Sequence, residues 1–295
     1  MNMSSFSHTP VLLTEAIDGL AIKIGKKYID ATLGGGGHTS LILERGGVVL
    51  GIDRDKDALD YVSENQKEAI QNHKLSVVKG NFSDIKKIAI EAGFGNVEGV
   101  LFDLGVSSYQ LDTVERGFSI KNDARLDMRM DRRAKLTAFD VVNHYPKDEL
   151  IDIFYTFGEE HNAKLIATEI VDKRKKNEIT TTKELASLIE RIPHKSEPIH
   201  PATRVFQAIR IEVNGEITAI KKGVGESVGL LNSAGRVVVI SFHSLEDRAV
   251  KQIFEKLRQE NIGKIITKKP ITADATEIAK NRRSRSAKLR IFEKK

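Results

Sequence analysis

The sequence predicts an α/β fold in which a doubly wound, mostly parallel sheet is interrupted by a helical insertion. Short apolar runs alternate with helical patterns over the first hundred residues, which is typical of β–α units. The character changes near residue 113, and a strongly apolar strand pattern returns only after residue 234. The 295 residues suffice for two modest domains. We therefore expect a discontinuous domain of residues 1–112 and 214–295 around an insertion of residues 113–213.

The expected strands are short apolar runs bounded by turn residues. They cover residues 28–32, 48–53, 75–79, 97–103, 235–242, 264–267 and 287–293. The run at 235–242 is apolar enough for a buried strand, whereas the last two are expected to be edge or terminal strands.

The expected helices show apolar residues at intervals near 3.6. Three of them begin near His38, Asp55 and Asp84, and both aspartates suit an N-cap position. Later helical stretches cover residues 147–176, 183–192, 201–213 and 245–260. Thr181 and Glu184 can form a capping box for the second of these, and the third opens on a proline.

Composition limits the class of protein and the chemistry available to it. Hydrophobic residues make up 40% and charged residues 30%, as in globular proteins. No apolar run approaches the roughly 18 residues needed to cross a bilayer, and the start MNMSSFSHTP resembles no targeting signal, so we expect a cytoplasmic protein. The absence of cysteine excludes disulfides, cysteine-ligated metals and a cysteine nucleophile.

The net charge of +6 is concentrated at the C-terminal end. Residues 261–295 hold 11 Lys or Arg against 3 Asp or Glu, whereas the first 260 residues hold 36 against 38. A near-neutral body with a basic end favours an anionic macromolecular partner such as nucleic acid, although a solvated basic tail needs no partner.

A run of four glycines, Gly34 to Gly37, separates the first expected strand from the first expected helix. Such a turn lets the backbone approach a ligand closely at a helix N-terminus. The alternative is a tight turn with no ligand. A P-loop would require Lys and Ser or Thr where His38 and Thr39 stand, and a dinucleotide fingerprint would require Gly or Ala at position 39. The turn therefore favours a different nucleoside-bearing ligand.

Acidic or aromatic side chains lie at or just after the ends of the next three expected strands. Asp53 ends the second strand 19 residues after Gly34, where a carboxylate can accept hydrogen bonds from both ribose hydroxyls; the alternative is a helix cap. Phe82 follows the third strand and Asp103 ends the fourth. Ligands of open α/β folds bind at this carboxyl edge. The layout matches the S-adenosylmethionine pocket of Rossmann-like methyltransferases, with ribose at strand two, adenine at strand three and the reaction at strand four.

Asp103 begins a loop of small residues, DLGVSSYQLD. A carboxylate here can accept a hydrogen bond from an exocyclic amine and orient it toward a methyl group. The alternative is a structural carboxylate, and for Ser107 and Ser108 a turn is as good a reading as a substrate contact. Methylation at carbon 5 of a pyrimidine usually starts with cysteine attack, so the absence of cysteine argues against that route.

His243 and Asp247 lie four residues apart after the strand expected at 235–242. This spacing suits either a metal pair or a turn anchored by the histidine. No second cluster supplies further ligands, so we expect no metal and expect His243 to anchor the turn.

Eight segments together resemble one protein family. They are HTPVLL (8–13), DATLGGGGHT (30–39), DLGVSSYQLD (103–112), RGFS (116–119), LDMRMD (126–131), HPATRVFQAIRIEVNGE (200–216), SFHSLEDR (241–248) and RSAKLR (285–290). In order and over nearly the whole chain they resemble the ribosomal RNA small-subunit methyltransferase H family, also called MraW. The chain departs from the family at Ala124-Arg125, where Gly-Pro is typical.

The resemblance implies a class I S-adenosylmethionine-dependent methyltransferase fold with an inserted helical domain that recognises RNA. It implies methyl transfer to N4 of a cytidine in the decoding centre of 16S rRNA, within the small ribosomal subunit or its late precursor, and no membrane partner. The implied cofactor contacts are Gly36, Gly37, His38, Asp53, Phe82, Asp103 and Gln110. Asp103 is also the expected catalytic residue, and Gln110 rests on the resemblance alone.

Three other functions remain as alternatives. The chain could methylate DNA or a protein amine, it could sense a nucleotide or bind RNA with an inactive pocket, or it could be a nicotinamide dehydrogenase. The intact Asp53 and Asp103 argue against an inactive pocket, and the basic C-terminal end favours structured RNA. We expect Arg282, Arg283 and Arg285 to face RNA. Neighbouring Lys288 and Arg290 also suit a solvated edge strand.

Overall fold

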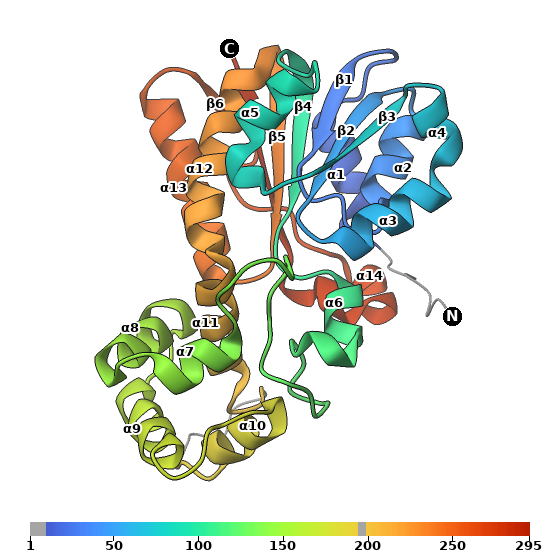
Figure 1. The fold of residues 1–295 in the computed structure, drawn as a ribbon. Coiled ribbons are helices and arrows are strands. Elements are labelled where there is room, and N and C mark those ends of the chain that lie inside the picture. The colour runs from blue at the N-terminus through green and yellow to red at the C-terminus, as the bar shows by residue number, and fades with distance from the viewer. Residues whose placement is uncertain (1–9, 194–198) are drawn as a thin grey trace. The chain divides into compact units, whose positions relative to one another are not determined.

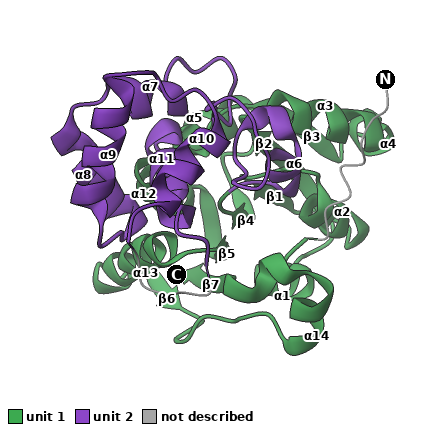
Figure 2. Ribbon diagram, turned by 90° about the horizontal axis from the view of Figure 1, so that it is seen from below, with its two compact units in different colours: residues 1–105, 217–295 green, residues 106–216 purple. Residues whose placement is uncertain are grey.

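The computed structural model describes residues 10–193 and 199–295, and the chain forms two compact units (Figure 2). The first unit comprises residues 1–105 and 217–295, and the second comprises residues 106–216. The second unit thus begins seven residues earlier and ends three residues later than the insertion expected at 113–213. Each unit has hydrophobic clusters of its own.

A seven-stranded sheet with the order β3-β2-β1-β4-β5-β7-β6 forms the centre of the first unit (Figure 1). Its strands are β1 (Lys27–Asp30), β2 (Val48–Asp53), β3 (Leu75–Lys79), β4 (Val97–Asp103), β5 (Leu231–Ser241), β6 (Gly263–Ile265) and β7 (Lys288–Lys294). The first five strands are parallel, and β7 is antiparallel to both β5 and β6. The strand order reverses between β1 and β4, which is where ligands bind in doubly wound sheets.

Helices cover both faces of this sheet. Successive strand residues point to opposite faces, and both sets of side chains are apolar, so each face needs a covering layer. Tyr28 belongs to one hydrophobic cluster and Ile29 to the other, and Val49 and Leu50 divide in the same way. One face packs on α1 (Leu13–Leu20), α2 (Gly37–Glu44) and α3 (Lys56–Asn65). The other packs on α5 (Ile85–Glu91), α12 (Glu216–Ser227) and α13 (Ser244–Gln259). The short helices α4 (Lys67–Gln71) and α14 (Ala275–Lys280) complete the unit.

The second unit is helical. Its helices are α6 (Ser108–Asp112), α7 (Ala138–His144), α8 (Lys147–Gly158), α9 (Ala163–Arg174), α10 (Thr182–Glu190) and α11 (Thr203–Asn214). Leu150, Phe154, Ile166 and Ile209 lie at its centre and are at most 2% exposed. Between α6 and α7 the chain is largely irregular, apart from one short 3-10 turn, η2 (Val114–Arg116).

The expected element bounds are confirmed for β2, β3 and β4, whereas one helical expectation is wrong. The stretch 147–176 is interrupted after Gly158, where Glu159 adopts a left-handed φ of 51°. A Cβ at residue 158 would lie 2.8 Å from the carbonyl oxygen of Arg204, so α8 and α11 approach closely there. The helix expected from about Pro201 toward Val213 is present as α11, but it begins at Thr203, so Pro201 is not its first residue.

The expected capping residues have mixed outcomes. Asp55 caps α3 by accepting a hydrogen bond from the backbone of Asp57, and Thr181 and Glu184 form the expected capping box of α10. Asp84 makes no such bond and pairs with Lys222 instead. Within the described ranges, no helix has both the length and the apolar composition needed to span a bilayer.

Candidate cofactor-binding and active site

The glycine-rich turn joins β1 to α2 at the carboxyl edge of the sheet. Gly34 and Gly36 have φ values of 49° and 74°, in the region that favours glycine. Gly37 is the first residue of α2, and a Cβ there would lie 2.2 Å from the Pro10 side chain. The backbone of residue 37 is therefore packed too closely for any side chain. Residues 8 and 9 of the HTPVLL segment lie outside the described residues.

Asp53 ends β2 next to this turn. One carboxylate oxygen accepts a 2.8 Å hydrogen bond from the backbone N–H of Gly34, and the other accepts one of 2.8 Å from that of Asp55. Burial raises the pKa of Asp53, and these two hydrogen bonds oppose the shift. The segment 51–57 does cap α3, as the alternative had it, but the capping residue is Asp55 and not Asp53.

Asp103 ends β4, and its carboxyl group lies among other ionisable side chains. The Nδ1 atom of His38 lies 3.8 Å from Asp103 Oδ2, and the Nε2 atom of His38 lies 3.2 Å from the carbonyl oxygen of Val11. Burial raises the pKa of Asp103 well above its ordinary value, and the charges of Asp30 and Glu246 raise it further. Among the residues that the structure describes, Asp103 Oδ1 is buried and has no hydrogen-bond partner. Such a carboxyl group is suited to a cationic ligand, because the cation would favour its ionised form.

Asp30, which sequence reasoning missed, connects the glycine turn to Asp103. Its carboxylate accepts a 2.7 Å hydrogen bond from the Thr39 hydroxyl and a 3.2 Å hydrogen bond from the backbone of Thr32. The Thr32 hydroxyl oxygen in turn accepts a 2.6 Å hydrogen bond from the backbone N–H of Asp103. Asp30 is only 1% exposed, and burial raises its pKa to about 6. Its place at a strand end, like those of Asp53 and Asp103, is the sequence signal that could have identified it.

Phe82 lies on a single 3-10 turn, η1 (Phe82–Asp84), that follows β3. Its ring packs edge-on against Phe102 with centroids 5.6 Å apart, and the Arg54 guanidinium lies 5.9 Å from the ring centroid. The side chain is 7% exposed. Most of Phe82 therefore belongs to the hydrophobic core, and an adenine could contact only the remaining edge.

Gln110 belongs to the second unit and has a clear local role there. The backbone of Ser107 donates a 3.1 Å hydrogen bond to the Gln110 side chain, and the backbone of Gln110 donates one of 3.1 Å to the Ser107 hydroxyl. The pair forms the capping box of α6, which confirms the turn interpretation of Ser107. A cofactor contact of Gln110 stays a prediction.

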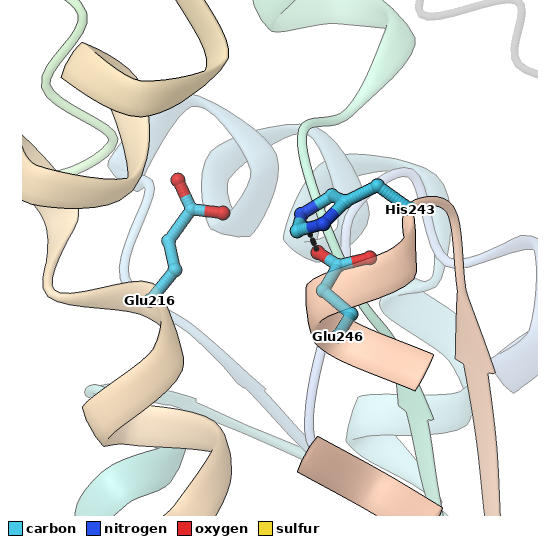
Figure 3. Close-up of side chains that lie close together, drawn as sticks. All are labelled: Glu216, His243 and Glu246. Carbon is cyan, nitrogen blue, oxygen red and sulfur yellow. Dashed lines mark ion pairs between the residues drawn. The ribbon is translucent and has the colours of Figure 1, made fainter. Parts of the chain in front are cut away.

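His243 and Asp247 follow β5; the backbone N–H of Asp247 donates a 3.2 Å hydrogen bond to the carbonyl oxygen of His243, and each side chain pairs with a different residue. His243 Nε2 lies 3.2 Å from Glu246 Oε1 (Figure 3). Asp247 is held by two residues of β7, at 2.6 Å from Arg290 Nε and 3.3 Å from Lys288 Nζ. The fully buried Glu246 also accepts a 2.7 Å hydrogen bond from the backbone of Phe242, so it ties the end of β5 to α13. Glu246 is a second site residue that the sequence did not single out.

Asp30→Asn is expected to flatten the pH dependence of folding stability. A carboxyl group with a pKa near 3.8 when unfolded and about 6 when folded binds more protons in the folded state between these values. Its contribution to stability is therefore present below pH 4 and lost as the pH rises through 6, by roughly 2–3 kcal/mol. Denaturant unfolding at pH 4.5 and 7.5 measures this. A parent and a variant that lose equal stability over that interval would contradict the assignment.

The strand order with a single reversed strand, the glycine-rich turn after β1 and the acids that end β2 and β4 define a class I methyltransferase. A model of the MraW methylase family matches residues 5–295. The chain belongs to this family, and the nicotinamide dehydrogenase alternative is wrong.

Curated relatives match along the whole chain. Three of them, each named ribosomal RNA small subunit methyltransferase H, come from Carboxydothermus hydrogenoformans, Persephonella marina and Brevibacillus brevis. They are 49%, 48% and 46% identical to this chain. The alignments cover 98%, 96% and 100% of this chain and 98%, 98% and 100% of the relatives.

Proposed function

We propose that the chain transfers a methyl group from S-adenosylmethionine to the N4 amine of a cytidine in the decoding centre of 16S rRNA, within the small ribosomal subunit or its late precursor. The observation that carries the proposal is the buried Asp103 carboxyl group at the switch point of a methyltransferase sheet. The names of the relatives support ribosomal RNA of the small subunit as the substrate.

The first unit has the features that S-adenosylmethionine requires. Asp53 would accept hydrogen bonds from the ribose, and the backbone at Gly36 and Gly37 would face the methionine part. The exposed edge of Phe82 would contact the adenine. The cofactor, when bound, supplies a methyl group on a positively charged sulfonium. The buried acids Asp30, Asp103 and Glu246 suit that charge, because a cation lowers the cost of ionising neighbouring carboxyl groups.

Two further contacts are proposed near the methionine part. The first is His38, whose ring lies in the glycine-rich turn with Nε2 3.2 Å from the carbonyl oxygen of Val11 and Nδ1 3.8 Å from Asp103 Oδ2. The second is Gln110, which is proposed as a cofactor contact on the basis of the family resemblance alone. Its side chain also forms part of the cap of α6.

An amine acceptor fits the residues at the end of β4. The lone pair of an aromatic amine is delocalised into the ring, and it must be localised on nitrogen before it attacks a methyl group. Asp103 can accept a hydrogen bond from the amine N–H and favour that geometry, which is orientation and electrostatic catalysis by a fixed group. With no cysteine in the chain, attack on carbon 6 of the ring has no thiolate to begin it.

The C-terminal arginines of the first unit are the proposed contact to RNA. Arg282, Arg283 and Arg285 lie on a 3-10 turn, η4 (Arg282–Ser286), and all three are exposed. Lys288 and Arg290 are instead held by Asp247 and are half-buried and buried. Because the cations of β7 are already paired with Asp247 and the three arginines are exposed, we infer that the three arginines bind phosphate.

Replacing Arg282, Arg283 and Arg285 by alanine is expected to flatten the salt dependence of binding to small subunits. Each lost phosphate contact lowers the slope of log affinity against log salt by about 0.7 to 0.9, so the expected change is roughly 2. Affinity for S-adenosylmethionine should stay unchanged. An unaltered salt slope would mean that these arginines serve solubility.

Transfer of a labelled methyl group tests the proposal. We expect label to enter the RNA of small subunits that lack the modification, and not large subunits or free cytidine. Label in DNA or protein would favour another acceptor, and S-adenosylmethionine binding without transfer to any of them would favour a sensing module.

A further inference from the structure

The second unit contains a basic loop, residues 121–135, in the irregular chain between α6 and α7 (Figure 1). It holds 6 Lys or Arg and 3 Asp or Glu. A loop of this length without helix or strand is ordinarily mobile or functional. This one is fixed along its length by contacts within the second unit.

Alternate side chains anchor the middle of the basic loop. Leu126, Met128 and Met130 are at most 4% exposed and belong to the hydrophobic cluster of the second unit. Arg116, itself 2% exposed, donates hydrogen bonds of 3.1 and 3.0 Å to the carbonyl oxygens of Arg129 and Met130. The buried Arg116 guanidinium thus fixes the backbone of the basic loop at Arg129 and Met130.

Asn214, the last residue of α11, clamps the same segment. Its side chain accepts a 2.8 Å hydrogen bond from the backbone of Met130 and donates one of 2.8 Å to the carbonyl oxygen of Met128. Between these contacts Met128 has a φ of 57°, a left-handed conformation that a residue with a long side chain rarely adopts. Such strain persists only where surrounding contacts determine the backbone, and it is common at binding sites.

The tip of the basic loop is folded around Arg129. That guanidinium forms a two-pronged ion pair with Asp127, with distances of 2.9 and 2.7 Å. It also donates hydrogen bonds of 3.0 and 2.8 Å to the carbonyl oxygens of Arg132 and Ala134. The charge of Arg129 is therefore balanced inside the loop, and its hydrogen bonds shape the turn that follows.

This turn presents three cations to solvent. Arg132, Arg133 and Lys135 are exposed. Arg133 forms a two-pronged ion pair with Asp131, with 3.1 Å from Nε to Oδ1 and 2.8 Å from Nη2 to Oδ2, so part of its charge is balanced within the loop. None of the three side chains contributes to the hydrophobic core. The fold therefore holds a strained backbone in place, and this backbone carries Arg132, Arg133 and Lys135 at the surface of the second unit.

We propose that Arg132, Arg133 and Lys135 form a preorganised contact for the phosphates of the ribosomal RNA substrate. The inference rests on the proposed function and names the residues of the second unit that would contact RNA phosphates. Guanidinium groups match phosphate geometry, and phosphate contacts fix the register of a protein on nucleic acid. A backbone that is already ordered loses less conformational entropy on binding.

The test compares two triple variants in binding to small subunits across a salt series. R132A/R133A/K135A is expected to lower the slope of log affinity against log salt by about 2, which corresponds to about 40-fold weaker binding at 0.15 M salt. The control K173A/K176A/K183A removes the same charge from exposed lysines on and near α9 and α10 of the second unit. A control that weakens binding as much, or a loop variant that binds like the parent, would overturn the inference.

A second variant tests preorganisation separately from charge. Asn214→Ala keeps every cation of the basic loop, so we expect an unchanged salt slope with affinity several-fold lower. Thermal melting checks that the variant is folded. Parental affinity in a folded Asn214→Ala protein would show that the clamp is not used in binding, and if the variant fails to fold, the two triple variants still decide the inference.

These results separate the two proposals. If the parent neither binds nor methylates small subunits, the proposed function is wrong. If the parent does both and the loop variant is indistinguishable from it, only the inference about the basic loop is wrong.

Discussion

Asp103→Asn is expected to slow methyl transfer by about a hundredfold, the effect of removing one fixed electrostatic group from an active site. Asparagine keeps the shape of the carboxyl group and resembles its protonated form, but it cannot carry the negative charge. Because the backbone N–H of Asp103 remains bonded to Thr32, the end of β4 should keep its position. The expected loss therefore lies in the chemical step.

Single-turnover transfer to small subunits, with cofactor and particle saturating, isolates that step. Thermal melting and S-adenosylmethionine binding serve as controls for fold and cofactor site. If Asp103→Asn transfers its methyl group as fast as the parent, the charge of Asp103 is not used and the proposed electrostatic role is wrong.

Asp53→Ala is expected to weaken S-adenosylmethionine binding by about 1.5–3 kcal/mol, or roughly 10- to 150-fold, the scale of hydrogen bonds to a charged group. The substitution removes the proposed ribose acceptor and also the acceptor for the backbone N–H groups of Gly34 and Asp55. Both effects act on the same turn, so the loss should appear in binding. Titration calorimetry measures it.

Asp55→Ala is the matched control, because it removes a carboxylate two residues away that caps α3. Loss of an N-cap should lower the free energy of unfolding by about 1 kcal/mol. The affinity for S-adenosylmethionine should not change. Equal affinities of the parent and Asp53→Ala for S-adenosylmethionine would remove Asp53 from the site.

The sheet was largely predictable because its strands carry a strong local signal. The strands β2 and β4 are largely buried, and β3 is an edge strand in which only Leu75 is buried, yet all three read as short, mainly apolar runs between turn residues. Helix α12 was not expected, since Gly223, Gly225 and Gly229 in and just after it argue against a helix. The structure explains Gly223: a Cβ there would lie 2.5 Å from the carbonyl oxygen of Phe82. Tertiary packing thus overrides local propensity.

The candidate site was predictable only where residues stand at strand ends. Asp53 and Asp103 could be identified because the carboxyl edge of a parallel sheet gathers such residues. Glu246 could not, since it lies inside α13 and its burial depends on contacts that no local pattern encodes. The clamp of Asn214 on Met128 and Met130 is similarly invisible in sequence, because it joins positions more than eighty residues apart.

The identity of the methylated nucleoside tests the central claim most directly. Small subunits methylated in vitro with labelled S-adenosylmethionine would be digested to nucleosides, and the labelled product compared by chromatography and mass spectrometry with methylcytidine standards. We expect a single labelled nucleoside, N4-methylcytidine. The same nucleoside should be missing when the Asp103→Asn variant replaces the parent and the reaction is stopped early. Label in 5-methylcytidine, in a ribose-methylated nucleoside or in a methylated purine would contradict it.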